Sequence, residues 1–246
     1  MKKVFIPAAA APPIVLASCK KSEKDPIENA PPSILEPRFT IMAQPNHIWG
    51  SEPFVMGQNN SVNGTDIQID EVMFYLSNFS AISLQGDSVA LRGLILVDAS
   101  TDDMLMIAHS DETFIYDFKF YLGLDYDTSH AALKLANAPM NDPCMHWVWN
   151  INAGYKFLKT EGKSDVDGNG NFEPFRIHAA KDASSRTIIQ TVILDLTERS
   201  NTVHMDIDYQ SALAEVDFTG HSVIQGASNL AKSIADAFGT SVLDFK

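Results

Sequence analysis

The sequence predicts an all-β protein, an antiparallel β-sandwich with a short C-terminal helix. Short apolar runs rich in β-branched and aromatic residues alternate with turn residues along most of the chain, which is typical of such sandwiches. The chain has 246 residues, of which 45% are hydrophobic, and this is enough for one large packed domain. Helical spacing is confined to a region near the C-terminus.

Nine segments are expected to be strands. Residues 187–196 form the most β-branched run and are expected at the centre of a sheet. Asn63-Gly64, Gln85-Gly86-Asp87 and residues 165–171 supply turns between strands. The predicted strands are residues 38–42, 67–77, 89–97, 114–122, 145–150, 155–160, 175–178, 187–196 and 202–208.

Residues 228–238 are the main predicted helix. Leu230, Ile234 and Phe238 recur at helical spacing, and Gly239 follows as a stop signal. The sequence therefore predicts a minor helical cap on a β domain.

The first 18 residues predict a lipoprotein signal peptide. Lys2 and Lys3 precede an apolar run over residues 4–16, and Leu16-Ala17-Ser18-Cys19 resembles a lipobox. Cleavage before Cys19 and lipidation of its sulfur would anchor the protein to a lipid bilayer without a transmembrane helix. An ordinary signal peptide with an incidental cysteine is the alternative.

Residues 19–37 are expected to form a flexible tether because they are rich in charge and proline, and residues 38–246 form the expected domain. If a lipid occupies Cys19, Cys144 has no partner for a disulfide within the chain. Cys144 is then either a small buried apolar side chain or a soft copper ligand.

The composition argues against nucleic acid as a partner. The chain has 31 acidic and 18 basic residues, a formal net charge of −13. Phosphate binding requires clustered lysine and arginine. An acidic surface concentrates cations and also favours solubility.

The most informative segment is residues 139–162, which holds two of the three tryptophans beside a histidine. Its Met145-x-Trp147-x-Trp149 run, followed by Gly154-Tyr155-x-Phe157 and Glu161-Gly162, resembles the MbnP-like family of periplasmic and surface copper-binding proteins. The resemblance covers about residues 39–246. Further similar motifs are Phe74-Tyr75-Leu76-Ser77-Asn78, Phe120-Tyr121-Leu122-Gly123-Leu124, Phe175-Arg176-Ile177-His178 and Ile234-Ala235-Asp236-Ala237-Phe238.

Two departures from the family pattern stand out. Four residues separate Trp149 from Gly154 where two are expected, and Ala179-Ala180 replaces a Leu-Gly after His178. A two-residue insertion preserves the facing of a strand, because side chains alternate with a period of two. Neither departure removes a potential metal ligand.

The resemblance implies a copper site built from histidines and kynurenine, an oxidation product of tryptophan formed with a partner di-haem protein, of the cytochrome c peroxidase type. Imidazole suits copper, and the chain has seven histidines. The resemblance singles out His47 and His178 first and His146 next. The possible modified residues are Trp149, Trp147 and Trp49. The alternative is that these tryptophans only pack the core.

A second possible metal site lies in the 165–172 segment. Oxygen ligands at Asp165, Asp167 and Asn169, with Asn171 following, resemble the first half of a calcium loop. The twelfth position is Arg176 where an EF-hand has glutamate, so an EF-hand is not expected. A glycine-rich hairpin turn is the alternative.

Known catalytic signatures are missing from the sequence: it has no Gly-x-Ser-x-Gly, His-Glu-x-x-His, P-loop or dinucleotide motif. We therefore expect a non-enzymatic, lipid-anchored copper-binding protein for copper capture or homeostasis. Its expected location is the outer membrane, facing the periplasm or the exterior. The alternative is a surface β-sandwich lipoprotein that binds a protein or glycan, with structural calcium. A third reading is an electron-transfer partner of a haem protein.

Overall fold

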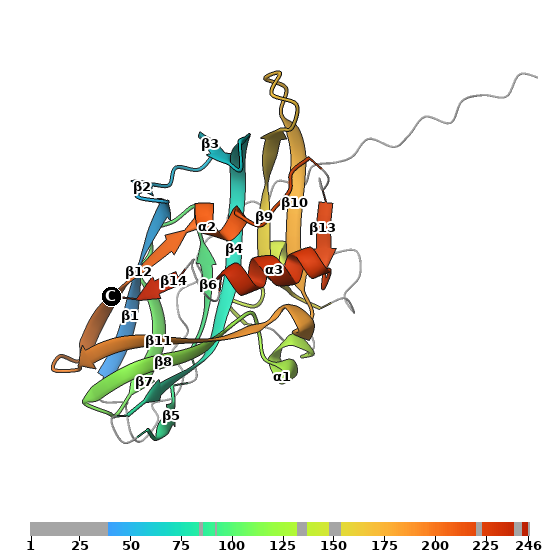
Figure 1. The fold of residues 1–246 in the computed structure, drawn as a ribbon. Helices are drawn as coiled ribbons and strands as arrows, with labels where there is room; N and C mark the ends of the chain where they lie inside the picture. The colour runs from blue at the N-terminus through green and yellow to red at the C-terminus, as the bar shows by residue number, and fades with distance from the viewer. Residues whose placement is uncertain are drawn as a thin grey trace, which may run out of the picture. The chain divides into compact units, whose positions relative to one another are not determined.

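The computed structural model describes residues 39–83, 86–91, 93–131, 137–147, 154–219, 223–238 and 243–245 (Figure 1). The predicted signal peptide, the predicted tether and Cys19 lie outside the described residues. Trp149 and His221 also lie outside them. None of the described helices is long and apolar enough to cross a membrane.

Two β-sheets build the described part of the chain, which confirms the all-β sandwich prediction. The smaller sheet has five strands in the order β14-β12-β1-β2, with β7 also pairing with β1. Its strands are β1 (Phe39–Trp49), β2 (Glu52–Pro53), β7 (Leu105–Ser110), β12 (Ser200–Asp208) and β14 (Leu243–Phe245).

The larger sheet has nine strands, and its central order is β11-β8-β4-β9-β10-β13. The long strand β4 also pairs with β3, β5 and β6 along its length. These strands are β3 (Asn59–Val62), β4 (Thr65–Ile82), β5 (Ser88–Ala90), β6 (Leu94–Asp98), β8 (Phe114–Leu122), β9 (Lys156–Asp165), β10 (Glu173–Ala180), β11 (Arg186–Asp195) and β13 (Val223–Gly226).

The described strands pair mostly antiparallel, with two exceptions. β1 and β12 run parallel, and so do β10 and β13. The two sheets are therefore mixed, which the sequence did not predict.

The main core is an apolar cluster that draws residues from both sheets and from two helices. Side chains of β10 alternate, so Ile177 joins this core while His178 lies on the opposite face of the larger sheet. A smaller apolar cluster, with Met73 and Tyr75 of β4 and Phe157 of β9, lies on that opposite face.

The predicted C-terminal helix is confirmed as α3 (Asn229–Ala237), which packs along β10 (Figure 1). The side chain of Ser228 caps its first turn by accepting a hydrogen bond from the Ala231 amide. Two shorter helices, α1 (Tyr126–Ser129) and α2 (Tyr209–Leu213), begin after the capping residues Asp125 and Asp208.

Several predicted boundaries are wrong. The expected strand 38–42 extends to Trp49, and the expected strand 89–97 is divided into β5 and β6. The expected strand 145–150 is not found in its described part. Asp142 caps a 3₁₀ turn over Pro143–Met145, because aspartate followed by proline starts a helical turn more readily than a strand.

Candidate metal site

Residues 137–147, the covering segment, lie against the outward face of the larger sheet. Met140 and Met145 pack into the smaller apolar cluster there. Two hydrogen bonds fix the segment to the sheet: the Tyr75 hydroxyl donates to the Pro139 carbonyl (3.3 Å), and Lys156 Nζ donates to the Cys144 carbonyl (2.7 Å). The segment thereby holds His146 and Trp147 close to the sheet.

His178 lies on the same face, at 4% exposure. Its Nε2 is 2.7 Å from Oε1 of Glu161, a diagonal neighbour on β9. The edge of the His178 ring meets the Trp147 ring, with ring centroids 5.4 Å apart. The register of β9 and β10, together with the covering segment, therefore brings a histidine, a carboxylate and an indole together.

The charge states of this pair follow from burial and from neighbouring charges. Burial lowers the pKa of His178, and the Lys156 and Lys159 ammonium groups add to this, against the opposing effect of Glu161. Burial alone would raise the pKa of Glu161, but the His178 hydrogen bond and the Lys159 charge outweigh it and hold this pKa at about 2. At neutral pH the pair is therefore a neutral imidazole and a carboxylate.

This assignment fixes the tautomer of His178. A carboxylate can only accept, so Nε2 carries the proton and Nδ1 carries the lone pair. Nδ1 is buried and has no hydrogen-bond partner among the described residues. A buried acceptor without a partner is unfavourable, and a metal ion would satisfy it.

His146 and Tyr155 add two more buried polar atoms without partners, His146 Nδ1 and the Tyr155 hydroxyl. The two residues form an isolated β-bridge, and their rings meet edge to face with centroids 6.5 Å apart. Burial lowers the pKa of His146, and the Lys156 charge lowers it further. His146 is therefore also a neutral imidazole at neutral pH.

Two lysines complete the electrostatics of the site. Lys159 is buried between two carboxylates, with Nζ 2.6 Å from Glu71 Oε2 and 3.8 Å from Glu161 Oε1. Lys156 Nζ lies 5.1 Å from the centroid of the Trp147 ring. Burial, and then repulsion by Lys159, lower the pKa of Lys156 to about 8.

His178 and Glu161 fit a metal ion better than His47, the other histidine that the sequence analysis placed first. A carboxylate that accepts from one imidazole nitrogen while the other nitrogen binds metal is the usual support of a metal-binding histidine. Within the described ranges, no three side chains of the His, Cys, Asp and Glu types converge on one point.

His47 lies elsewhere, on β1 of the smaller sheet. Its Nε2 is 3.1 Å from the Thr101 carbonyl and its Nδ1 is 2.7 Å from the Tyr209 hydroxyl. Since a carbonyl only accepts, Nε2 donates and Nδ1 accepts from the tyrosine. Burial lowers the pKa of His47. Both ring nitrogens of the neutral side chain are thus engaged, which leaves no lone pair for a metal.

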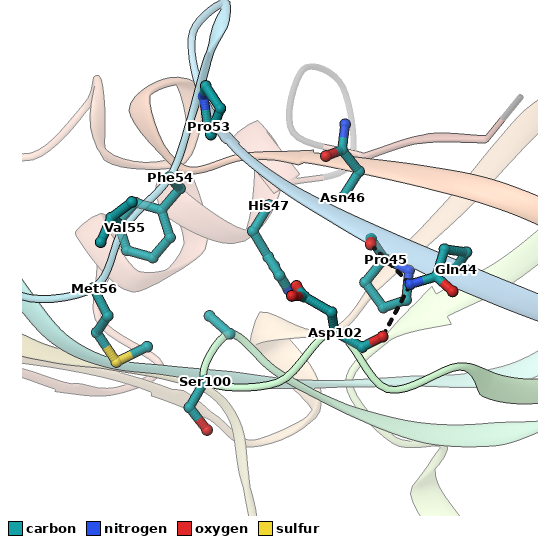
Figure 2. A pocket seen from close by; sticks show the side chains of 11 residues that line it. Gln44, Pro45, Asn46, His47, Pro53, Phe54, Val55, Met56, Ser100 and Asp102 are labelled. Atoms are coloured by element: carbon teal, nitrogen blue, oxygen red, sulfur yellow. Dashed lines mark hydrogen bonds between the residues drawn. The ribbon is translucent and has the colours of Figure 1, made fainter.

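A cavity of about 680 Å³ opens beside His47. Figure 2 shows that Phe54, Val55 and Met56 line one side of it. On another side, Gln44 donates a 2.9 Å hydrogen bond to the Asp102 carbonyl. Trp49 does not line this cavity, but stacks on Phe54 with centroids 6.4 Å apart and packs against the core.

The structure predicts a stabilising role for His47. Replacing Tyr209 by Phe would leave the buried Nδ1 of His47 without a donor and reduce the free energy of unfolding by about 1–2 kcal/mol. Urea unfolding monitored by circular dichroism measures this. Tyr126→Phe, at a side chain that is 65% exposed, is the matched control and should change little. Equal stabilities of the two variants would contradict a stabilising hydrogen bond between Tyr209 and His47.

The predicted calcium loop is a hairpin turn between β9 and β10. Both carboxylate oxygens of Asp165 accept from backbone amides, those of Asn169 (3.1 Å) and Gly170 (2.9 Å). Asp167 accepts from the amide and the side chain of Asn169, and Asn171 donates its amide to Asn169 Oδ1. The arrangement favours the hairpin alternative, because these oxygens stabilise the turn.

Cys144 is buried within the smaller apolar cluster, as expected. It is disulfide-bonded in the structure, so the expectation that it has no partner is wrong. That expectation depended on Cys19 carrying a lipid.

Comparison with known families and solved structures identifies the family of this chain. The family model described as MbnP matches residues 38–229, which is most of the chain. The chain belongs to the MbnP family. A solved structure, MbnP from Methylosinus trichosporium, is similar to the chain with a TM-score of 0.51 and 14% identity. The match covers 76% of this chain and 80% of that one, and at this identity it shows the fold alone. No curated protein matches the chain.

Within this MbnP-family chain, Glu161, Lys156 and Lys159 are the site residues that sequence reasoning missed. Glu161-Gly162 was noticed only as a motif after the aromatic run. The signal in the sequence is the same-face spacing of Lys159 and Glu161, but the predicted strand 155–160 stops before Glu161, whereas β9 extends to Asp165. The positions of Lys159 and Glu161 beside His178 depend on the register of β9 against β10.

Proposed function

We propose that this MbnP-family protein binds copper for capture or homeostasis in the cell envelope and performs no catalysis itself. The observation that carries the proposal is the buried His178 imidazole, whose Nε2 is held by Glu161 and whose Nδ1 has no partner. Imidazole nitrogen is a good copper ligand, and membership of the MbnP family supports a role linked to copper.

His178 would hold copper through Nδ1, and His146 would contribute as the second histidine. Glu161 orients the His178 ring and raises the basicity of its lone pair. The covering segment shields the site from water. Copper bound there would act as cargo, and its oxidation state depends on the donors that join the histidines.

A tryptophan of the Met145-x-Trp147-x-Trp149 run is the proposed additional donor. Indole is electron-rich, and oxidation to kynurenine would supply an aryl amine that can coordinate copper. Trp147 lies beside His178, but the Lys156 ammonium faces its ring and opposes the loss of an electron. The modification is therefore proposed at Trp149, with a partner di-haem protein of the cytochrome c peroxidase type as the oxidant.

The test is to purify the chain without residues 1–19 from its native host and to measure metal content together with peptide masses. About one copper per chain and a mass shift on the peptide that carries Trp149 would support the proposal. Unmodified tryptophans and no copper, even after loading, would refute it. A thermal shift caused by calcium alone would then favour the surface-protein alternative.

The carboxylate behind His178 provides a sharper prediction. Replacing Glu161 by Gln keeps a hydrogen-bond acceptor for His178 Nε2 but removes the negative charge. Copper binding should weaken by about tenfold, the low end of the effect of losing a residue that hydrogen-bonds to a metal ligand. Glu71→Gln is the matched control, because Glu71 also pairs with Lys159, whereas the carboxylate hydrogen-bonded to His178 Nε2 is that of Glu161. Competition titration with a copper chelator measures both. Equal losses in the two variants would assign the effect to charge alone.

We propose that a lipid on Cys19 anchors the protein to the outer membrane. The chain contains two cysteines, and Cys144 is disulfide-bonded in the structure, so a lipid on Cys19 and a disulfide between the two cysteines exclude each other. Mass spectrometry of the protein from native membranes distinguishes the lipidated form from the form with a disulfide. A diacylated N-terminal peptide with a Cys144 thiol would support the anchor, and a disulfide between the two cysteines would contradict it.

A further inference from the structure

A second group of soft donors lies on the outward face of the smaller sheet, which carries none of the His178 site. Met42 of β1 is directly paired with Met106 of β7. On its other side β1 pairs with β12, where Thr202 is the partner of Met42 and His204 is the partner of Gln44. Met106 is 51% exposed and His204 is also exposed, so both face solvent.

A β-bulge brings a second histidine to this face. The pairing of β1 with β7 shifts between Ile41 and Met42. Ile107 and Ala108 are consequently both buried, although they are adjacent in the strand. Met106 and His109, on either side of them, therefore project to the same outward face. Without the bulge their spacing of three residues would put them on opposite faces.

Two side-chain contacts show that outward neighbours on these strands do meet. Thr40 Oγ1 lies 3.3 Å from His109 Nδ1 across β1 and β7. Asn46 Nδ2 donates to Asp206 Oδ1 at 2.8 Å across β1 and β12. In the tautomer in which His109 Nδ1 donates to Thr40 Oγ1, Nε2 carries the lone pair and is the nitrogen that can bind a ligand.

The distances between paired strands suit a shared ion. Directly paired side chains have Cβ atoms about 4.5–5.5 Å apart, and diagonal neighbours are within reach of long side chains. Met42 and Met106 are a direct pair, and His109, whose partner Thr40 is two residues from Met42, is the diagonal neighbour on the same face. His204, opposite Gln44 on β12, lies two strands from His109 and further along β1, too far to share an ion with it. Thioether sulfur together with imidazole selects soft ions, above all Cu(I). The net charge of −13 favours the approach of cations.

We propose that Met42, Met106 and His109, the thioether patch, form an exposed binding site for a soft monovalent cation, Cu(I), separate from the His178 site. The choice of copper rests on the proposed function, but the selectivity for a soft ion rests on the donors alone. An exposed site of this kind would bind and release the ion more readily than a buried one.

The experiment uses Ag(I) as a redox-inert probe of soft-ion binding. In the chain labelled with ¹³C at its methionine methyl groups, Ag(I) should shift the Met42 and Met106 signals in a saturable way, while buried Met73 and Met205 stay unchanged. Calorimetry should show one fewer bound Ag(I) in the Met42→Leu, Met106→Leu double variant. Met56→Leu, at a half-buried methionine packed against the core, is the matched control.

The same number of bound Ag(I) ions in the parent and the double variant would overturn the proposal, as would displacement of Ag(I) by equimolar Zn(II). His178→Ala separates this inference from the proposed function. If the methyl shifts persist in that variant, the thioether patch is an independent site, even if copper never binds at His178. If the shifts vanish with His178, the patch has no site of its own and the inference fails.

Discussion

Replacing His178 by Ala should reduce copper affinity by more than about a hundredfold, because even the loss of an outer partner of a metal ligand weakens binding ~10–100-fold. The physical reason is that His178 Nδ1 is the buried lone pair that the fold holds without a partner. The fold itself should survive, since His178 lies on the face of β10 that is opposite the main core. Competition with a copper chelator, together with circular dichroism, measures both effects.

His47→Ala is the matched control for this experiment. His47 is also a buried histidine on a strand, but its two nitrogens are engaged by Thr101 and Tyr209. That variant should lose stability and keep its copper affinity. If His47→Ala loses copper and His178→Ala keeps it, the assignment of the site is wrong and the ligands belong to the smaller sheet.

Replacing Gly162 by Ala should cost about 3 kcal/mol in the free energy of unfolding, the upper end of the usual cost of overpacking. Gly162 lies in β9 between Ile69 of β4 and Phe175 of β10. A Cβ added there would come within 2.1 Å of the Gln68 carbonyl oxygen and 3.0 Å of the Ile69 Cα. Neither backbone atom can move without disturbing the centre of the larger sheet.

Gly168→Ala distinguishes this steric effect from the general effect of losing a glycine. Gly168 has a φ of +69° in the hairpin turn, and an added Cβ would meet nothing within 4 Å. That variant should cost roughly 1 kcal/mol, the strain of a left-handed backbone. Urea unfolding of both variants measures the difference. A Gly162 variant no less stable than the Gly168 variant would show that the strands can separate at little cost.

Much of the fold was predictable because it depends on local patterns. The helical spacing that became α3 satisfies both its own preference and its tertiary environment, and the β-branched run became the strand β11. The expected place of that run at the centre of a sheet is wrong, because β11 lies at the end of the strand order of the larger sheet, next to β8, and β-branching indicates a strand without fixing its position. β7 was missed because its bulge places Ile107 and Ala108 side by side in the core and so breaks the alternation that reveals a strand. The sequence does not predict the full length of β1, because Pro45 is unusual inside a strand. The strand accommodates Pro45 because β7 pairs with residues 39–43 and β2 with residues 48–49, so Pro45 has no partner in either of these strands.

The site was predictable only in part. His178 and Trp147 could be singled out by their motifs, and the structure brings them into contact. Glu161 could not be identified as the partner of His178, because their proximity depends on a strand register that no local pattern records. His47 could not be recognised as a structural residue, because Thr101 and Tyr209 come from distant parts of the chain.

The central claim is that His178 Nδ1 is the copper ligand at the covering segment. A crystal structure of the copper-loaded protein, with anomalous data at the copper edge, tests it most directly. We expect copper bound to His178 Nδ1, with Nε2 still hydrogen-bonded to Glu161, and weaker occupancy at the thioether patch if Cu(I) is present. Copper bound at His47, with His178 Nδ1 unbound, would contradict the account.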